Sequence, residues 1–343
     1  MIRVGVIGYG YWGPNLVRNF TNLANTQVVA VCDQSPSRLE LVHKRYPGVQ
    51  TWQDPQQLLT SPLIDAVAIA TPVSSHYELA LAALQHNKHV LVEKPLTMST
   101  QQAQTLITEA KKRQRVLLVD HTFVYTSAVR KLKTLIQTQE LGEIYYYDSV
   151  RVNLGLFQHD VNVLWDLAVH DLSIIDYLFS TPPNAVSATG ISHLPGEPEN
   201  LAYLTLFFPN NLIAHIHVNW LAPVKVRRTL IGGSQKMIVF DDLEPTEKIK
   251  VYDKGVNVVT DRESVYNMLI SYRTGDMYSP HLEATEALTL ELQHFADCIL
   301  HQHAPITGGE AGYRVVAILE AAMRSMQQRG QPIALHWDSG FKV

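Results

Sequence analysis

The sequence has few cysteines and no long hydrophobic run. Cys32 and Cys298 lie far apart in a chain of 343 residues, which excludes the closely spaced framework of a small disulfide-rich protein. We therefore expect a reduced, intracellular setting, with the cytoplasm as the default location. No apolar run approaches the ~18 residues that span a bilayer, so we predict no membrane partner. The apolar start MIRVGVIGYG is soon broken by glycine, which favours a first β-strand over a signal peptide.

The chain also lacks an excess of positive charge. Its formal net charge is −4 and 17% of its residues are charged, with no basic stripe that would predict a nucleic-acid partner. Hydrophobic residues make up 46%, which is typical of a globular protein rather than a disordered one. We find no internal repeat or low-complexity tract, and the length suffices for two domains with separate cores.

The first part of the sequence alternates between short apolar segments and amphipathic ones. Apolar segments rich in Val, Ile and Leu are typical of parallel strands covered on both faces. We expect such strands at Arg3–Ile7, Gln27–Cys32, Ile64–Ala70, His89–Glu93 and Arg115–Val119. The amphipathic segments predict helices at Asn15–Leu23, Ser37–Tyr46, Ser75–His86 and Ser99–Arg113. Residues 1–121 are therefore predicted to form an α/β domain with a doubly wound, open parallel sheet.

The pattern changes after residue 121. Helices are expected at Ser127–Gln139 and Trp165–Phe179, with a strand at Ile144–Asn153 between them. Further strands then follow one another without helices, at Ala202–Phe208, Leu212–Leu221, Val226–Ile231, Lys236–Phe240 and Lys248–Tyr252. Two more helices are expected near Leu282–His301 and Glu310–Arg329. Residues 122–343 are predicted to form a second α/β domain with a large, open, mostly antiparallel sheet.

A glycine-rich loop, GYGYWG, follows the first expected strand. Gly8 allows a tight turn, Gly10 lets the backbone approach a pyrophosphate, and Gly13 lets the next helix pack closely. The free N–H groups at the start of that helix favour a bound phosphate. The segment thus predicts a dinucleotide site, whose other loop residues are Tyr9, Tyr11 and Trp12.

Asp33 ends the second expected strand, twenty residues beyond the glycine loop. A carboxylate there accepts both ribose hydroxyls and opposes a 2′-phosphate, so it favours NAD over NADP as the cofactor. Arg38 can stack on the adenine or weaken that preference. Thr71, Pro72 and His76 follow another strand, at the kind of edge where ligands collect in such sheets. His76 is equally compatible with a surface position at a helix start.

Glu93, Lys94 and Pro95 come at the end of the strand His89–Glu93, so Lys94 is expected at the same edge as the cofactor. An ammonium group there can orient a substrate hydroxyl or donate to a developing oxyanion. The alternative is a solvated lysine in a surface loop. We assign Glu93 and Lys94 to the cofactor site and Lys94 also to catalysis.

Asp166 and His170 lie four residues apart in a predicted helix, so that both side chains leave the same helical face. His170 is the best candidate for a general base or acid, because the ordinary pKa of histidine lies near neutral pH. Asp166 can orient the imidazole or contact the same hydroxyl. Two alternatives remain, namely a simple hydrogen bond on a helix surface and a pair of metal ligands. No third ligand stands at a readable spacing, so we predict no metal.

Other polar residues are weaker candidates for binding substrate. They are His121, Thr122 and Tyr125 after the last strand of the first domain, Arg151 and Asn153 on the next strand, and Gln158, His159, Asn162 and Trp165 beyond it. Any strand has a polar face, which accounts more simply for the alternation. His215, His217 and Asn219 alternate too, and a polar sheet face or a subunit contact accounts for them better than a metal site.

Together these motifs resemble those of the Gfo/Idh/MocA oxidoreductases. The resemblance rests on GYGYWG, Asp33, Ala70-Thr71-Pro72, Glu93-Lys94-Pro95 and Asp166-x-x-x-His170, in this order. It covers essentially the whole chain, including the closing segment GGEAGYRVVAILEAAMRSMQQRG. Val169 stands where many relatives have proline, which leaves the acid–base pair unchanged.

The resemblance implies an N-terminal Rossmann domain and a C-terminal α/β domain whose open sheet serves contacts in a homodimer or homotetramer. It implies reversible oxidation of a secondary alcohol on a small sugar, cyclitol or nucleotide-sugar. Lys94, Asp166 and His170 match the family's catalytic lysine, aspartate and histidine, and the lysine–proline peptide of the family is often cis. The stretches GYWGPNLVRNF and RVNLGLFQHDVNVLWDL look most like members from nucleotide-sugar pathways.

The sequence thus leads to the hypothesis of an NAD-dependent sugar dehydrogenase. A cyclitol or free-sugar dehydrogenase is the alternative among enzymes. A non-catalytic NAD-binding sensor or scaffold is the alternative of another class, and it needs neither Lys94 nor His170.

Overall fold

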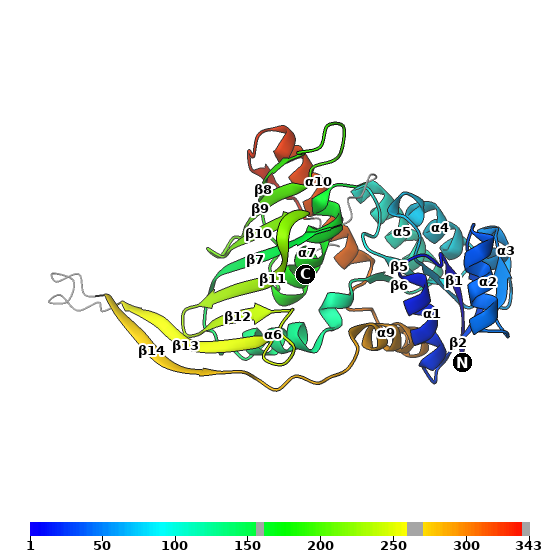
Figure 1. The fold of residues 1–343 in the computed structure, drawn as a ribbon, viewed down its shortest axis with the longest axis horizontal. Coiled ribbons are helices and arrows are strands. Elements are labelled where there is room, and N and C mark those ends of the chain that lie inside the picture. Colours follow the sequence, from blue (N-terminus) through cyan, green and yellow to red (C-terminus); the bar gives the residue numbers. More distant parts are fainter. Residues whose placement is uncertain (156–160, 259–269, 338–343) are drawn as a thin grey trace. The chain divides into compact units, whose positions relative to one another are not determined.

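The computed structural model describes residues 1–155, 161–258 and 270–337, and the chain divides into two compact units. The N-terminal unit consists of Met1–Thr126 and Thr285–Glu320, and the C-terminal unit of Ser127–Ala284 and Ala321–Val343. Figure 1 shows the two sheets around which these units are built. The segment Thr285–Glu320 thus belongs to the N-terminal unit, although it follows the strands of the C-terminal unit in the sequence. The sequence pattern does not predict this.

The sheet of the N-terminal unit is parallel, in the order β3-β2-β1-β4-β5-β6. Its strands are β1 (Ile2–Ile7), β2 (Thr26–Cys32), β3 (Gln50–Trp52), β4 (Ala66–Ile69), β5 (His89–Glu93) and β6 (Leu117–Asp120). This order confirms the predicted doubly wound sheet. Strand β3 was not predicted, because its three residues are partly exposed at the sheet edge and carry no apolar run.

Helices follow the strands of this sheet. They are α1 (Gly13–Asn22), α2 (Pro36–Arg45), α3 (Pro55–Thr60), α4 (His76–Gln85) and α5 (Thr100–Arg113), with the short turns η1 (Val73–Ser75) and η2 (Thr122–Tyr125). From the returning segment come α9 (Ala287–His301) and the start of α10 (Gly309–Gln327). Phe20 of α1 meets Phe295 of α9 edge to face at 6.4 Å, and both are fully buried. Helix α9 therefore completes the core of the parallel sheet.

The sheet of the C-terminal unit has the order β14-β13-β12-β11-β7-β10-β9-β8-β15. Its strands are β7 (Ile144–Leu154), β8 (Ala185–Ile191), β9 (Leu201–Phe207), β10 (Ile213–Asn219), β11 (Leu221–Gly233), β12 (Met237–Asp241), β13 (Ile249–Val258), β14 (Ile270–Tyr278) and β15 (Ile333–Ala334). Strands β7 and β10 pair in parallel and the other described pairs are antiparallel. The predicted open, mostly antiparallel sheet is confirmed. Figure 1 shows β13 and β14 as long neighbouring strands at one edge of this sheet.

The helices of this unit include α6 (Ser127–Gln137), the π-turn η3 (Leu164–Ala168) and α7 (Val169–Leu178). A buried ion pair joins α7 to the sheet. Arg151 of β7 donates from Nε to Oδ2 of Asp171 at 2.6 Å, and the Ser149 hydroxyl donates to Oδ1 at 2.6 Å. Arg151 is 6% exposed and Asp171 1% exposed, so both charges are removed from water and depend on each other.

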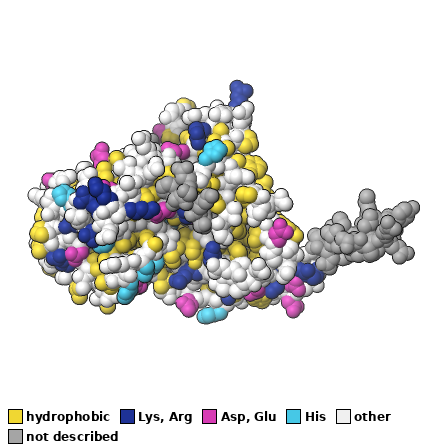
Figure 2. Space-filling model, turned by 180° about the vertical axis from the view of Figure 1, so that it is seen from behind, with side chains coloured by type: hydrophobic (Ala, Val, Ile, Leu, Met, Phe, Trp, Pro, Cys, Tyr) yellow, Lys and Arg dark blue, Asp and Glu magenta, His cyan; other side chains and the backbone are white. Residues whose placement is uncertain are grey.

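On the face drawn in Figure 2, Lys and Arg side chains lie in small groups among acidic, histidine and hydrophobic side chains rather than in one continuous stripe. Among the described residues, no helix is long and apolar enough to cross a membrane.

We predict that Asp171→Leu lowers the free energy of unfolding by about 3–5 kcal/mol, because it leaves the Arg151 guanidinium buried without its counter-ion. Urea denaturation followed by circular dichroism measures the loss. The double variant Arg151→Met/Asp171→Leu is the control, since it removes both charges and should recover most of the stability. Equal losses in the single and double variants would show that the ion pair is not what holds α7 on β7.

Candidate functional site

The glycine loop lies between β1 and α1, as the sequence predicts, and each glycine has a separate steric reason. A Cβ atom on Gly8 would come within 2.5 Å of the Ala70 carbonyl oxygen, and Gly8 has a φ of 95°. A Cβ on Gly13 would lie 2.1 Å from the carbonyl oxygen of Gly8. At Gly10 the nearest atom is Arg38 Nη1 at 3.7 Å, so this surface stays open. Gly8 and Gly13 thus allow the backbone of the turn to pack closely, and Gly10 leaves room for a phosphate group to approach the backbone.

Asp33 lies just past β2 and is 7% exposed. Its Oδ2 accepts the Tyr9 N–H at 2.7 Å, and its Oδ1 accepts the Ser35 N–H at 2.8 Å. Arg38 Nη1 lies 3.4 Å from Oδ2, with the Arg38 side chain 53% exposed. The carboxylate therefore fixes the backbone of the glycine loop, a role that the spacing alone did not reveal.

The aromatic residues of the loop divide into buried and exposed ones. Tyr9 is 6% exposed and belongs to the core of the parallel sheet. Tyr11 is 84% exposed and Trp12 37%, and their rings meet edge to face at 5.6 Å. Only Tyr11 and Trp12 thus present rings that a ligand can reach.

His76 joins two loops at the carboxyl edge of the sheet. Its Nδ1 lies 2.9 Å from the Pro95 carbonyl oxygen and its Nε2 lies 2.8 Å from the Thr71 carbonyl oxygen. The residue is 1% exposed, which excludes the alternative of a surface position. Both neighbours are acceptors, so a neutral ring donates to only one of them at a time. Burial is the main cause that lowers the pKa of His76, the nearby Lys94 lowers it further, and the two carbonyl groups oppose them.

Lys94 follows β5, and the Lys94–Pro95 peptide is cis. The Lys94 N–H donates to Oε2 of Glu93 at 3.1 Å, so the carboxyl group of Glu93 folds back on the loop. Glu93 is itself 7% exposed. Strand pairing sets it opposite Asp120, the last residue of β6.

Glu93 belongs to a cluster of buried acids in the N-terminal unit, together with Asp120 and Glu291. Asp120 accepts the hydroxyl of Thr122 at 2.5 Å. Burial and then Asp120 raise the pKa of Glu93 well above its ordinary value, and the same two causes raise the pKa of Glu291. Burial and the neighbouring carboxyl group therefore favour the protonated forms of Glu93 and Glu291.

His121 and Tyr125 are both buried. Burial and the charge of Lys94 lower the pKa of His121 to about 3, and neither ring nitrogen has a hydrogen-bond partner among the described residues. The Tyr125 hydroxyl lies 3.0 Å from that of Thr307, and its side chain is 3% exposed. His121 is thus a neutral side chain next to the acid cluster, and Tyr125 packs within its own unit.

In the C-terminal unit, Asp166 lies in the π-turn η3 and His170 in the first turn of α7. The predicted helix Trp165–Phe179 therefore begins with one wider turn, a feature that is frequent at functional sites. The indole Nε1–H of Trp220, which is 1% exposed, donates to Asp166 Oδ2 at 3.1 Å. Asn162 caps the turn, because its Oδ1 accepts the N–H groups of Leu164 and Trp165 at 3.1 and 3.3 Å.

Three other candidates lie in the same unit. Arg151 is buried and bound to Asp171, as described above. Asn153 on β7 and Trp165 in η3 are partly exposed. Gln158 and His159 lie outside the described residues.

A metal site finds no support in the described part of the chain, where no group of three His, Cys, Asp or Glu residues could hold an ion. On the sheet, His217 stacks on the ring of Tyr203 at 4.4 Å, and the His215 ring lies 3.2 Å from the hydroxyl of Thr205.

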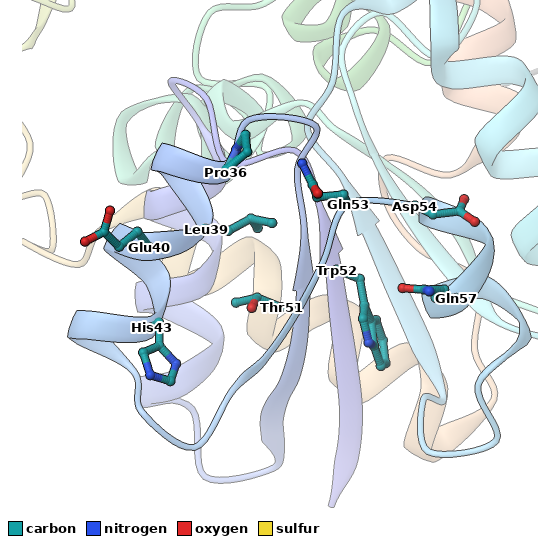
Figure 3. A pocket seen from close by; sticks show the side chains of 9 residues that line it. All are labelled: Pro36, Leu39, Glu40, His43, Thr51, Trp52, Gln53, Asp54 and Gln57. Atoms are coloured by element: carbon teal, nitrogen blue, oxygen red, sulfur yellow. The ribbon is translucent and has the colours of Figure 1, made fainter.

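A pocket of about 550 Å³ lies beside the segment that follows Asp33, between α2, β3 and the start of α3 (Figure 3). Pro36 and Gln53 stand at one end of it, with His43 and Glu40 on the helix α2.

Two family models match this chain. The oxidoreductase family model of an NAD-binding Rossmann fold, Gfo/Idh/MocA, matches residues 2–121. The model of the C-terminal α/β domain of the same family matches residues 133–335.

Individual proteins are similar over nearly the full length. UDP-N-acetylglucosamine 3-dehydrogenase of Acidithiobacillus ferrooxidans is 28% identical over 92% of this chain and 94% of its own. The scyllo-inositol 2-dehydrogenase (NAD⁺) of Bacillus subtilis is 25% identical over 89% of this chain and 88% of its own. A crystal structure of an oxidoreductase from Magnetospirillum magnetotacticum superposes with a TM-score of 0.80 and 28% identity, over 93% of this chain and 99% of its own.

The acid cluster predicts a pH dependence of stability. Because the pKa of Glu291 is raised above the ordinary value of 4.5, the folded state holds the proton to a higher pH than the unfolded chain. This contribution is complete below about pH 4.5 and is lost as the pH rises through the folded pKa. Glu291→Gln should remove part of this loss of stability, so that the variant is more stable than the wild type at pH 8.

Urea denaturation at pH 5 and pH 8 measures this difference. Glu78→Gln is the matched control, because Glu78 is exposed on α4 and should give the wild-type dependence. If Glu291→Gln has the wild-type stability at both pH values, a raised pKa of Glu291 in the folded state is contradicted.

Proposed function

This chain belongs to the Gfo/Idh/MocA oxidoreductase family, and we propose that it is an NAD-dependent dehydrogenase of a nucleotide-sugar. The two relatives named above are dehydrogenases that act on CH–OH groups. The enzyme oxidises a secondary hydroxyl of the sugar in a reversible reaction. The observation that carries the proposal is the support built around Asp166, one turn before His170. The indole of the buried Trp220 donates to the Asp166 carboxylate, and Asp166 lies in a capped π-turn, a feature that is frequent at functional sites.

The cofactor assignment rests on the glycine loop and Asp33. The open surface at Gly10 fits a pyrophosphate, and the N–H groups that begin α1 complement its charge. Asp33 is held in place by two backbone N–H groups, so its negative charge cannot turn away from a 2′-phosphate. This fixed charge favours NAD over NADP, although Arg38 lies close enough to reduce the preference.

NAD, which the glycine loop and Asp33 would hold, would supply the acceptor for the hydride of the substrate carbon. His170 takes the proton of the hydroxyl group, and Asp166 orients the imidazole or the hydroxyl. Lys94 donates to the substrate oxygen as negative charge develops on it. Glu93 and His76 position the loop that carries Lys94, through the hydrogen bonds to the Lys94 N–H and the Pro95 carbonyl.

The choice of substrate class rests on the relative named as UDP-N-acetylglucosamine 3-dehydrogenase, which is 28% identical over 92% of this chain. Relatives named as inositol dehydrogenases match this chain to a similar extent. A cyclitol or free-sugar dehydrogenase is the second candidate. A non-catalytic NAD sensor has no need of Lys94, Asp166 and His170 together. We further propose that the protein is a cytoplasmic homodimer or homotetramer. Light scattering measures the mass of this assembly.

We predict that Lys94→Ala and His170→Ala each keep NAD affinity within a few-fold and lower kcat by about 10²–10⁴-fold, because each removes a group that acts on the reacting oxygen. Isothermal titration calorimetry measures NAD binding, and absorbance of the reduced cofactor measures turnover. The matched controls are Lys112→Ala and His301→Ala, which replace exposed residues of the same types. Wild-type turnover in both active-site variants would show that other residues carry the chemistry.

We also predict that UDP or dTDP competes with the sugar substrate while leaving NAD affinity unchanged, because a nucleotide-sugar enzyme binds the nucleotide part of its substrate. Initial rates at several substrate concentrations give the type of inhibition. Inhibition by myo-inositol with no effect of either nucleotide would replace this substrate class with the cyclitol class.

A further inference from the structure

Two pockets of about 550 Å³ lie in the described part of the N-terminal unit, and they differ in charge. The ionisable residues that line the pocket of Figure 3 are Glu40, Asp54 and His43. The second, here called the β5–β6 pocket, lies at the amino ends of β5 and β6, against the ends of α5 and α9 and the start of α10. Its ionisable lining residues are His89, Lys111, Arg113, Arg115, Cys298, His303 and Glu310.

The histidine in the β5–β6 pocket has a defined tautomer. The backbone N–H of Val116 donates to Nδ1 of His89 at 3.0 Å, so Nδ1 carries no proton. Burial and then the charge of Arg115 lower the pKa of His89 to about 4, which keeps the ring neutral near pH 7. The proton of the neutral ring is therefore on Nε2, and Nε2 is a hydrogen-bond donor.

Arg115 approaches this donor with donors of its own. Its Nη1 lies 3.5 Å from Nε2 of His89, and two N–H groups that face each other make no hydrogen bond. Its Nε is buried and has no hydrogen-bond partner among the described residues. The two side chains thus bring donors together, and the buried Arg115 Nε costs free energy as long as it has no acceptor.

The other cations of the pocket already have partners. Lys111 pairs with Glu310 at 2.8 Å, and Arg113 pairs with Glu109. Glu310 is the one acidic side chain that lines the described part of this pocket, and it is engaged by Lys111. The described wall of the pocket therefore offers Arg115 no further carboxylate.

We propose that the β5–β6 pocket binds a phosphate group, either as inorganic phosphate or as the phosphate ester of a small metabolite. An anion oxygen placed between His89 Nε2 and the Arg115 guanidinium accepts from both. The volume suits a small organic phosphate as well as the free ion. The site is separate from the glycine loop, because the pocket lies at the amino ends of the strands whose carboxyl ends carry Lys94 and His121. It does not depend on the proposed function.

The experiment is a titration of the whole protein with sodium phosphate, at constant ionic strength maintained with sodium chloride. Amide shifts in ¹H–¹⁵N TROSY spectra report each site separately, so binding at the glycine loop is not confused with binding here. We expect saturable shifts at Val116 and Glu310, which border the pocket. Shifts that rise linearly with concentration, as nonspecific screening does, would overturn the proposal.

Variants test the role of the unpaired donors. Arg115→Gln should weaken phosphate binding by about tenfold or more, because it removes a charge-assisted hydrogen bond. Lys112→Gln removes the same charge from the adjacent helix at a side chain that is 72% exposed, and should change affinity by less than about twofold. Equal affinities of both variants and the wild type would contradict the site.

A second measurement needs no variant and no ligand. Long-range ¹H–¹⁵N spectra of the histidine rings should show the proton of His89 on Nε2 at neutral pH, and a proton on Nδ1 would overturn the proposal. Replacing inorganic phosphate with glycerol 3-phosphate then separates the two sources of the anion. Tighter binding of the ester identifies an organic phosphate as the ligand, and equal binding identifies the free ion.

Discussion

Parallel pairing of the strands is the constraint on which the N-terminal unit depends. Strands that run in one direction all end at one edge, so the residues that follow them come together although they are far apart in sequence. Gly8, Asp33, Thr71, Lys94 and His121 each follow the carboxyl end of a different strand. The pairing register adds a contact that no local pattern of the sequence contains. It sets Glu93 opposite Asp120, which raises the pKa of Glu93 further above its ordinary value.

The sequence predicts this edge well for simple physical reasons. Buried parallel strands are apolar throughout, so their ends are visible, and a glycine loop with an acid after the next strand is a specific signal of a dinucleotide site. The role of Asp33 in holding the Tyr9 N–H was missed, because a hydrogen bond to the backbone leaves no mark on residue type. The buried position of His76 was likewise undecided, since a histidine at a helix start is compatible with either environment.

Other parts of the site lie beyond sequence reasoning because they depend on partners from distant segments. Trp220 follows a strand of the C-terminal sheet, and nothing near it indicates that its indole reaches Asp166. Glu291 lies on a helix that looks amphipathic and ordinary, yet the chain's return to the N-terminal unit buries it beside Asp120. Arg151 was assigned to substrate from the polar face of its strand, and that face is covered by α7 and Asp171. The assignments of catalytic and substrate-binding residues stay predictions.

The π-turn at Leu164–Ala168 has a consequence for how this segment can change during evolution. A π-turn is an α-turn that has gained one residue, and each residue of a helix turns its neighbours by about 100°. Deleting one residue here would leave the composition of the segment almost intact, yet it would swing the Asp166 carboxylate away from the Trp220 indole. A single-codon deletion in this turn would therefore cost the indole contact, whereas a substitution away from Asp166 and the buried Leu164 and Ala168 keeps the spacing that this contact needs.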